Sequence, residues 1–498
     1  MVRKRFCLLV LLILLSGLLN VYAHDDDDEL FKPVEIKDGS SLSVMDCVAS
    51  AFKNSPKIKR KKYNLDIAKS NVGIAKSQYF PVINAGVGFY NENNSNNIYY
   101  NSHYRELPSV AVSVNKLIWN FGKTTAYIKM EEFYKIGAEY EFIDSLCSTV
   151  FDIKGKYYNL LRASALKDIA EYNIEINKHF LELAKDKNKC DITTAKLNLS
   201  DANVKFIEAQ NNYNNERVNL TNSMYLENQP DYSIKITKTF DYSSDYAKNP
   251  QEINSKDFKP EIFPFTREKA LEIAYDNSPD LSVLTSTKQA MEQSLLYIKR
   301  MYFPDLTVNA GYGYNNANIY NGNNSLQVGV NLNSNVNLME LRHSIKGADA
   351  QVYLADNEIL LFKKDLQYEL KRAFNDFDRA EKQIPASKLE VGQAYDNLKI
   401  VEDLYIKDKL NYIALQDARK DYIHSLNNYI ESLYNYNMAL IEVEMAMHYH
   451  LVDIHHKSEH AVHYHSQELV EHLNKALGCD EWEVPKTKKG RKQTSSDL

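Results

Sequence analysis

The segment LSVMDCVASAFKNSPKIKRKK, residues 42–62, decides the fold, because the chain repeats its plan as FTREKALEIAYDNSPDLSVLT at residues 265–285. Both segments carry an Asn-Ser-Pro at the same point, at 54–56 in the first and at 277–279 in the second. Proline is tolerated in the first turn of a helix but not in its interior. Each segment therefore predicts the start of a long helix, 43–79 or 266–302, whose first turns are broken at Asn-Ser-Pro.

Further matches follow in the same order along the chain. They are a Phe-Pro, an Asn-Ala-Gly and a single Ala, at 80–81 and 303–304, 84–86 and 309–311, and 195 and 418. Chance does not readily give four matches in one order at nearly one separation. We therefore interpret the chain as a tandem duplication, with repeat one at 42–264 and repeat two at 265–453.

Two very long helices are expected after the strands of each repeat. In repeat two, apolar residues recur at steps of three and four, which is the heptad pattern of coiled-coil packing. They are Ile345, Ala348, Val352, Ala355, Ile359, Phe362 and Leu366, then Leu415, Ala418, Tyr422, Leu426, Tyr429, Leu433, Tyr436, Leu440, Val443 and Met447. Residues 341–406 would form a helix of about 100 Å, which Pro385 is expected to kink or break. Residues 228–264, polar and aperiodic, are expected to connect the repeats.

Four segments alternate apolar residues with polar residues or glycine, which is typical of strands with one apolar face. They lie at 82–90, 110–118, 306–315 and 326–333, and the Asn-rich stretches 91–109 and 315–325 join them in pairs. Strands of about 9–11 residues with this pattern suit an outer-membrane barrel. The side chains expected to face lipid include Val112, Val114, Val308, Val328 and Val330.

Four strands cannot close a barrel, and lipid does not tolerate open sheet edges. Three copies of the chain would supply twelve strands and would place their long helices around one axis. The alternative is that each strand pair is a soluble hairpin packed on the helices. We favour a mixed α/β membrane protein, a homotrimer with a long antiparallel α-helical coiled-coil tunnel and a shared 12-stranded β-barrel.

The first 23 residues have the pattern of a secretory signal peptide. A basic triplet at 3–5 precedes an apolar run at 6–19, and small or aliphatic residues follow at the expected cleavage site. The run is too short to cross a bilayer core of about 30 Å as a helix, although an N-terminal anchor is the alternative. Residues 24–41 would form a lead-in and 454–498 a His-rich, then basic, tail. We expect a location in the outer membrane, with the helical domain in the periplasm.

Composition and motifs argue against several other functions. Charged residues make up 25% of the chain and the mean hydropathy is −0.47, which argues against a helical membrane protein. The net charge of −6 argues against a nucleic-acid partner, because such proteins usually carry a basic face. The sequence has no G-x-x-x-x-G-K-[ST], H-E-x-x-H or G-x-S-x-G motif. We therefore predict that the protein is not an enzyme and needs no cofactor.

Histidines gather near the C-terminus, where eight of the 13 fall between His448 and His472. One interpretation is a soluble polar tail. The other is a site for a divalent metal such as Zn²⁺, Ni²⁺ or Cu²⁺. Its candidate ligands are two residues one helical turn apart and two that follow, namely His456, His460, His463 and His465.

Residues 42–450 resemble the TolC-like outer-membrane efflux protein family. The resemblance rests on the duplicated Asn-Ser-Pro helix, the Phe-Pro before each outgoing strand, the stretch LIWNFGK at 117–123 and the periodic Ala/Leu/Tyr pattern of the long helices. It implies a homotrimer with a twelve-stranded barrel and a periplasmic helical tunnel. One departure is at the helical hairpin tips, where Lys185 and Asp408 stand in place of a frequent glycine.

The resemblance also implies gate residues at the periplasmic end of the tunnel. In the family, aspartates just after the hairpin tips line this end, and a tyrosine takes part in links between helices. Asp191 holds the first aspartate position in repeat one, and Tyr405 matches the tyrosine. In repeat two, Ala414 replaces the first aspartate and Asp417 matches the second. Three copies of Asp417 around one axis would attract cations.

These patterns predict an outer-membrane channel of a tripartite efflux or type I secretion system. The chain would be a passive, porin-like exit duct for substrates that an inner-membrane transporter delivers through a periplasmic adaptor, a membrane fusion protein. The transporter would supply the energy, because this chain has no nucleotide-binding motif. The alternative is an exported trimeric coiled-coil structural or adhesive surface protein, which would form no pore.

Overall fold

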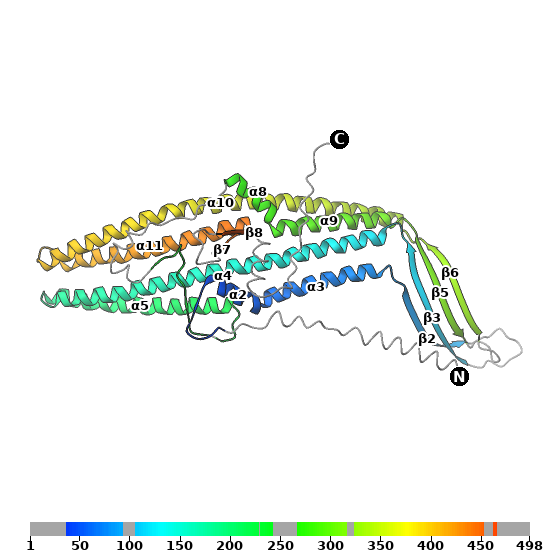
Figure 1. The fold of residues 1–498 in the computed structure, drawn as a ribbon, viewed down its shortest axis with the longest axis horizontal. Helices are drawn as coiled ribbons and strands as arrows, with labels where there is room; N and C mark the ends of the chain where they lie inside the picture. The colour runs from blue at the N-terminus through cyan, green and yellow to red at the C-terminus, as the bar shows by residue number, and fades with distance from the viewer. Residues whose placement is uncertain are drawn as a thin grey trace.

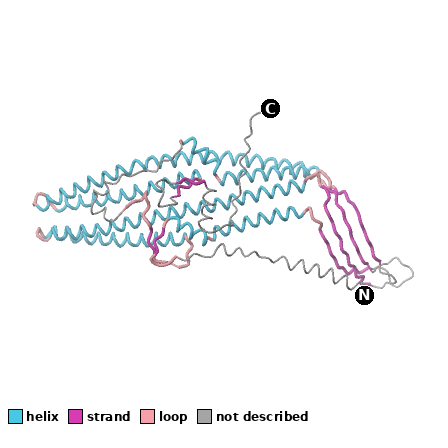
Figure 2. Tube along the Cα trace, viewed as in Figure 1, coloured by secondary structure: helices cyan, strands magenta, loops and turns pink. Residues whose placement is uncertain are grey.

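The computed structural model describes residues 36–92, 105–228, 230–242, 266–315, 323–452 and 462–465. The molecule is long and narrow, with a helical body that continues into a four-stranded sheet at one end (Figure 1 and Figure 2). The predicted signal peptide at 1–23 lies outside the described residues. No helix within the described ranges combines the length and the apolar character needed to cross a membrane.

The same six elements occur twice in the same order. Repeat one contains α2 (Val44–Asn54), α3 (Pro56–Ser77), β2 (Val82–Glu92), β3 (Arg105–Trp119), α4 (Lys123–Ala184) and α5 (Lys189–Ser223). Repeat two contains α8 (Arg267–Asn277), α9 (Pro279–Arg300), β5 (Asp305–Asn315), β6 (Asn323–Asn333), α10 (Leu338–Ile406) and α11 (Tyr412–Met447). Two short strand pairs complete the described elements, β1 (Ser40–Leu42) with β4 (Tyr232–Ile234), and β7 (Tyr449–Val452) with β8 (Val462–His465).

The Asn-Ser-Pro motif makes the same helix junction in both repeats. Ser55 and Ser278 have extended backbones that end one helix, and each serine hydroxyl accepts a hydrogen bond from the backbone of the next helix. Proline follows at the first helical position, where its missing N–H has no partner to lose. The motif thus divides each long helix into two, as predicted.

Helices α3, α4, α9 and α10 lie side by side in that order and lead into the strands β2, β3, β5 and β6 (Figure 1). The strands pair antiparallel in the same order, which leaves β2 and β6 at the two edges of the sheet. The four predicted strands are confirmed. The predicted loops at 91–109 and 315–325 are wrong at both ends. Strand β2 reaches Glu92 and β3 begins at Arg105, while β5 reaches Asn315 and β6 begins at Asn323. Backbone pairing prolongs each ladder beyond the residues whose side chains alternate.

The register of the sheet aligns its apolar residues in rows across the strands. Neighbouring rows on one face are Ile83–Val114–Ala310–Val328, Ala85–Val112–Tyr312–Leu326 and Lys116–Val308–Val330. An intervening row on the other face is Asn84–Ser113–Gly311–Gln327. In these rows the sheet therefore has one apolar face, apart from Lys116, and all five valines expected to face lipid lie on it.

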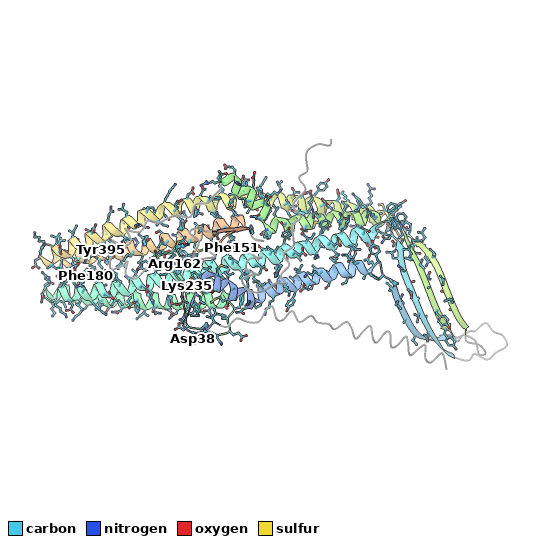
Figure 3. The ribbon with its side chains drawn as sticks, in the orientation of Figure 1. Asp38, Phe151, Arg162, Phe180, Lys235 and Tyr395 are labelled. Carbon is cyan, nitrogen blue, oxygen red and sulfur yellow. The ribbon has the colours of Figure 1, made fainter. Side chains whose placement is uncertain are left out.

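The long helices form two antiparallel hairpins, α4 with α5 and α10 with α11, that extend away from the sheet (Figure 1). All ten positions of the predicted heptad seam in α11, from Leu415 to Met447, are buried. Phe180 and Tyr395 lie in the hairpin half of the body, and Phe151 lies nearer its middle (Figure 3). The expectation that Pro385 breaks its helix is wrong, because α10 is 69 residues long and continues through Pro385. Pro385 lies on an exposed face, where its ring does not disturb the buried seam.

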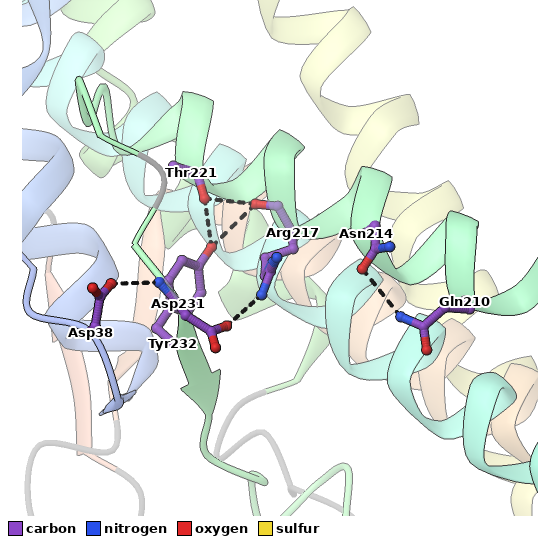
Figure 4. A network of polar contacts seen from close by, with 7 residues as sticks. All are labelled: Asp38, Gln210, Asn214, Arg217, Thr221, Asp231 and Tyr232. Atoms are coloured by element: carbon purple, nitrogen blue, oxygen red, sulfur yellow. Dashed lines mark hydrogen bonds and ion pairs between the residues drawn. The ribbon is translucent and has the colours of Figure 1, made fainter.

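A small polar clasp joins the start of repeat one to the segment after α5 (Figure 4). Strands β1 and β4 pair in parallel, and the Asp38 carboxylate accepts a hydrogen bond of 2.9 Å from the Asp231 backbone N–H. Arg217 Nη1 lies 2.6 Å from the Asp231 carboxylate. The hydroxyls of Thr221 and Tyr232 lie 2.9 Å apart beside it. The clasp therefore anchors both segments against the end of α5.

Replacement of Pro385 by Ala should stabilise the helical body. Alanine would restore the N–H that donates to the carbonyl of Glu381, and an interior proline costs about 3 kcal/mol relative to alanine. Because proline also restricts the unfolded chain, we expect a net gain of about 1–3 kcal/mol in chemical unfolding followed by circular dichroism. The exposed Gln383→Ala is the control and should change little. Lower stability of Pro385→Ala would contradict the assignment of a regular helix here.

Candidate functional site

The two hairpin tips lie next to each other at the end of the body remote from the sheet (Figure 1). The first tip is the turn at 185–188 between α4 and α5, and the second is the turn at 407–411 between α10 and α11. Asparagine caps the outgoing helix at both tips. Asn188 accepts a hydrogen bond from the Asp191 N–H at 2.9 Å, and Asn411 accepts one from the Ala414 N–H at 3.0 Å.

The two tips differ at the positions aligned with the family's glycine. Lys185 has right-handed helical dihedrals, so a side chain there causes no backbone strain. Asp408 has a φ of 57°, in the left-handed region that favours glycine. Its N–H donates to the Tyr405 carbonyl at 3.1 Å, and the Lys409 N–H donates to the Leu404 carbonyl at 2.9 Å. This is a Schellman motif, so the second tip keeps the backbone that glycine favours with an aspartate in its place.

The gate candidates Asp191 and Tyr405 are in direct contact. The Tyr405 hydroxyl donates a hydrogen bond of 3.2 Å to the Asp191 carboxylate, which joins the start of α5 to the end of α10. Tyr405 is only 2% exposed, and its ring lies edge to face with Tyr412 at 5.8 Å. Burial and then the Asp191 carboxylate raise the pKa of Tyr405 above its ordinary value. The phenol therefore stays protonated at neutral pH and remains a donor.

Lys187 completes this link between the hairpins. Its ammonium forms an ion pair with Asp408, lies 3.4 Å from the Ile406 carbonyl oxygen and lies 5.5 Å from the centroid of the Tyr405 ring. Lys187 could not be predicted from the sequence, because a lysine in a polar turn carries no pattern that distinguishes it. Only the approach of the two tips gives it a partner.

Asp417 is placed differently from the other two gate candidates. Its side chain is 63% exposed and its carboxylate lies 3.9 Å from Lys420 Nζ on the same helix. The structure thus brings Asp191 and Tyr405 together and leaves Asp417 on the surface of the single chain. Nearby cross-hairpin bonds join Gln416 Nε2 to Asn198 Oδ1 at 3.0 Å and Arg419 Nη1 to Asn173 Oδ1 at 2.6 Å. These hydrogen bonds could not be predicted from the sequence either, since they join residues far apart in the chain.

The predicted metal ligands of the tail fall largely outside the described residues. His456 and His460 lie there, so a site at these two residues stays a prediction. His463 and His465 belong to β8, where their Cα partners in β7 are Leu451 and Tyr449.

The Tyr405–Asp191 hydrogen bond should give a measurable coupling free energy. A cycle of Tyr405→Phe, Asp191→Ala and the double variant should yield about 1–2 kcal/mol in unfolding experiments, because the bond is buried at one end and accepted by a charged oxygen. Asp186→Ala, at the same tip, is the matched control and should show no coupling to Tyr405→Phe. Equal coupling in both cycles would show that the hydrogen bond does not join the tips.

Comparison with known proteins gives one match in sequence and several matches in fold. Residues 48–224 match the family model described as outer membrane efflux protein. The fold is similar to that of CusC, with a TM-score of 0.69 and 13% identity over 84% of this chain and 96% of that one. No curated protein matches the sequence.

Two further channels have similar folds. The Campylobacter jejuni CmeC outer membrane channel gives a TM-score of 0.67 and 14% identity over 84% of this chain and 91% of that one. The Vibrio cholerae outer membrane protein VceC gives 0.65 and 13% over 81% and 95%. The sequence match and the shared fold thus confirm the resemblance of this chain to the TolC-like outer-membrane efflux protein family.

Proposed function

We propose that three copies of this chain form an outer-membrane channel that serves as the passive exit duct of a tripartite efflux system. The observation that carries the proposal is that the sheet and the helical layer of one chain are open at the same two sides. The sheet ends at β2 and β6, and the helices that lead into them, α3 and α10, are the outer members of the row α3–α4–α9–α10. An edge strand offers unpaired backbone groups that another strand can complete.

The apolar face of the sheet supports a place in lipid. Residues of this face are exposed in the single chain, including Leu326, Val328 and Val330 at 75%, 73% and 69%. In a closed barrel of three copies, β6 of one chain would pair with β2 of the next and the apolar face would contact the membrane. The other face, which carries Asn84, Ser113 and Gln327, would line an aqueous interior.

The helical edges support the same assembly. Helix α3 exposes Tyr63, Ile67 and Ile74, and α10 exposes Tyr353, Leu354, Leu360, Leu361 and Tyr368. Exposed apolar residues on this scale are typical of protein interfaces. Because two different edges would meet, the contact is heterologous, and such contacts form a ring when the rotation closes. Three copies would then surround one axis as a helical tunnel.

The hairpin tips are the proposed contact with the periplasmic adaptor, which would connect the tunnel to an inner-membrane transporter. They lie at the end of the body remote from the sheet and hence would lie deepest in the periplasm. Efflux is the transport class in the description of the matching family. Export of proteins by type I secretion would use the same duct with another transporter.

The assembly should be visible in mild detergent as a trimer that forms conducting pores in planar bilayers. Val328→Lys should prevent insertion, since lysine on a lipid face costs about 2–4 kcal/mol near the bilayer midplane, and each trimer would carry three. Gln327→Lys, the neighbouring residue on the opposite face, is the matched control and should still insert and conduct. A stable conducting monomer, or equal effects of the two substitutions, would refute the shared barrel.

Loosening of the tip should raise single-channel conductance. Asp191→Ala with Tyr405→Phe removes both ends of one hydrogen bond between the hairpins, so the tunnel end should close less tightly. Asp417→Ala should instead reduce cation selectivity and block by multivalent cations from the periplasmic side, because three carboxylates around one axis attract cations. Asp186→Ala is the control for a lost tip charge. Unchanged conductance, selectivity and block would place the constriction elsewhere.

A further inference from the structure

Three side chains from separate parts of the chain converge at the middle of the helical body. They are Asp144 on α4, Asp280 in the first turn of α9 and His448 at the C-terminal end of α11. One carboxylate oxygen from each aspartate and one ring nitrogen of the histidine all lie within 4.8 Å of one another. This cluster is distinct from the hairpin tips and from the tail histidines.

His448 gives independent evidence that this cluster can bind a ligand. It is 9% exposed, and among the described residues its Nδ1 has no hydrogen-bond partner. A buried ring nitrogen without a partner costs free energy unless something occupies it. Burial lowers the pKa of His448 to about 4, so at neutral pH the ring is uncharged, which is the form that binds a metal.

The surroundings of the two carboxylates do not fully stabilise their negative charges. Burial, followed by the charge of Asp280, raises the pKa of Asp144 to about 6, while Lys61 and Lys57 oppose the rise. Asp280 is exposed, and partial burial of its carboxyl, followed by the charge of Glu141, also raises its pKa. Lys61 is held by Glu141 at 2.7 Å. A divalent cation between Asp144 and Asp280 would neutralise both carboxylates.

We propose that Asp144, Asp280 and His448 bind a divalent transition-metal ion of the Zn²⁺ type. Two carboxylate oxygens and one imidazole nitrogen leave one position of a tetrahedral site for water. The nitrogen donor argues against Ca²⁺ and Mg²⁺, which prefer oxygen ligands alone. Tetrahedral ligands lie about 3.3 Å apart at ordinary Zn–N and Zn–O distances, so rotamer changes of the two aspartates would close the site.

Cys147 lies one turn from Asp144 on α4 and could be mistaken for a ligand. It is fully buried in a small apolar cluster with Ile143, Phe151 and Ile441. Burial raises the pKa of its thiol far above the ordinary value, and a thiol must lose its proton to bind zinc. The ligand set is therefore one nitrogen and two oxygens.

Repeat one lacks the counterparts of Asp280 and His448. Lys57 occupies the position after Ser-Pro that Asp280 holds in repeat two, and Tyr225 stands 223 residues before His448. Tyr225 and His448 share a left-handed backbone, with φ of 53° and 48°, so the two positions correspond in conformation. An ammonium and a phenol in these places would not bind a divalent cation, so only the repeat-two residues at these two positions can join Asp144 of repeat one in a site.

A bound ion would hold the end of α11 against α4 and α9. Its role would be structural, since three elements that are remote in sequence would share one cross-link. Structural metal ions contribute directly to folding free energy. Removal of the ion should therefore lower stability rather than alter the charge of the tunnel end.

The test uses the full-length protein with Zn²⁺ as the probe, in a parent whose tail cannot compete. In this parent, all histidines of the tail region other than His448 are replaced by glutamine, namely His450, His455, His456, His460, His463, His465 and His472. Calorimetry should give one Zn²⁺ per chain. His448→Gln and Asp144→Asn should each weaken binding more than about 100-fold, because even partners that only support a ligand are worth 10–100-fold.

Asp276→Asn is the matched control, because Asp276 is exposed like Asp280 and lies four residues before it, but does not belong to the cluster. It removes the same charge and should leave Zn²⁺ affinity unchanged. Chelation should lower the thermal midpoint of the parent but not that of His448→Gln, which separates loss of metal from loss of fold. No binding by the parent, or equal binding by the parent and His448→Gln, would overturn the proposal.

Discussion

Unpaired backbone groups at the edges of the sheet are the constraint on which the rest of the molecule depends. Strands β2 and β6 each present a row of N–H and C=O groups that none of the other described strands completes. In water these groups can be solvated, but in lipid each would cost several kcal/mol. In the proposed channel, copies of the chain would complete these groups. The duplicated sequence serves that need, since it places one open edge at each side of a layer in which every strand continues a helix.

The duplication also explains why the two halves can differ. Each repeat supplies the same helix junction through Asn-Ser-Pro, so the backbone plan is preserved while individual side chains diverge. At the tips, Lys185 is right-handed and Asp408 is left-handed, and only the second forms the Schellman turn. The ion pair between Lys187 and Asp408 then uses this asymmetry to join the hairpins.

Local chemistry made much of the fold predictable from the sequence. Ser-Pro junctions, alternation in the strands and the heptad seam of α11 are determined by neighbouring residues, so the helix and strand positions follow from them. The loop at 91–109 and the effect of Pro385 were predicted less well. The first depends on backbone pairing between β2 and β3, which side-chain alternation does not report. The second depends on which side of α10 is buried, since Pro385 lies on the exposed side.

The residues of the candidate sites also differ in how far the sequence predicts them. Asp191 and Tyr405 were found through the resemblance, whereas Lys187 has a role only because two turns 221 residues apart meet. The convergence of Asp144, Asp280 and His448 was likewise hidden, because its three residues are separated by well over a hundred positions. No spacing rule reaches that far. The tail histidines, by contrast, are close in sequence, so their spacing alone predicts a metal site.

The continuity of α10 has a mechanical consequence. A helix of 69 residues acts as a stiff rod from the tip to the sheet, and stiff rods transmit displacement along their length. At Pro385 one rung of the hydrogen-bond ladder is missing, and helices bend most readily where a rung is lost. We therefore expect a movement imposed on the tip to be taken up as flexure near this residue. The hairpin would then move outward about this bend, while the strands at the far end keep their register.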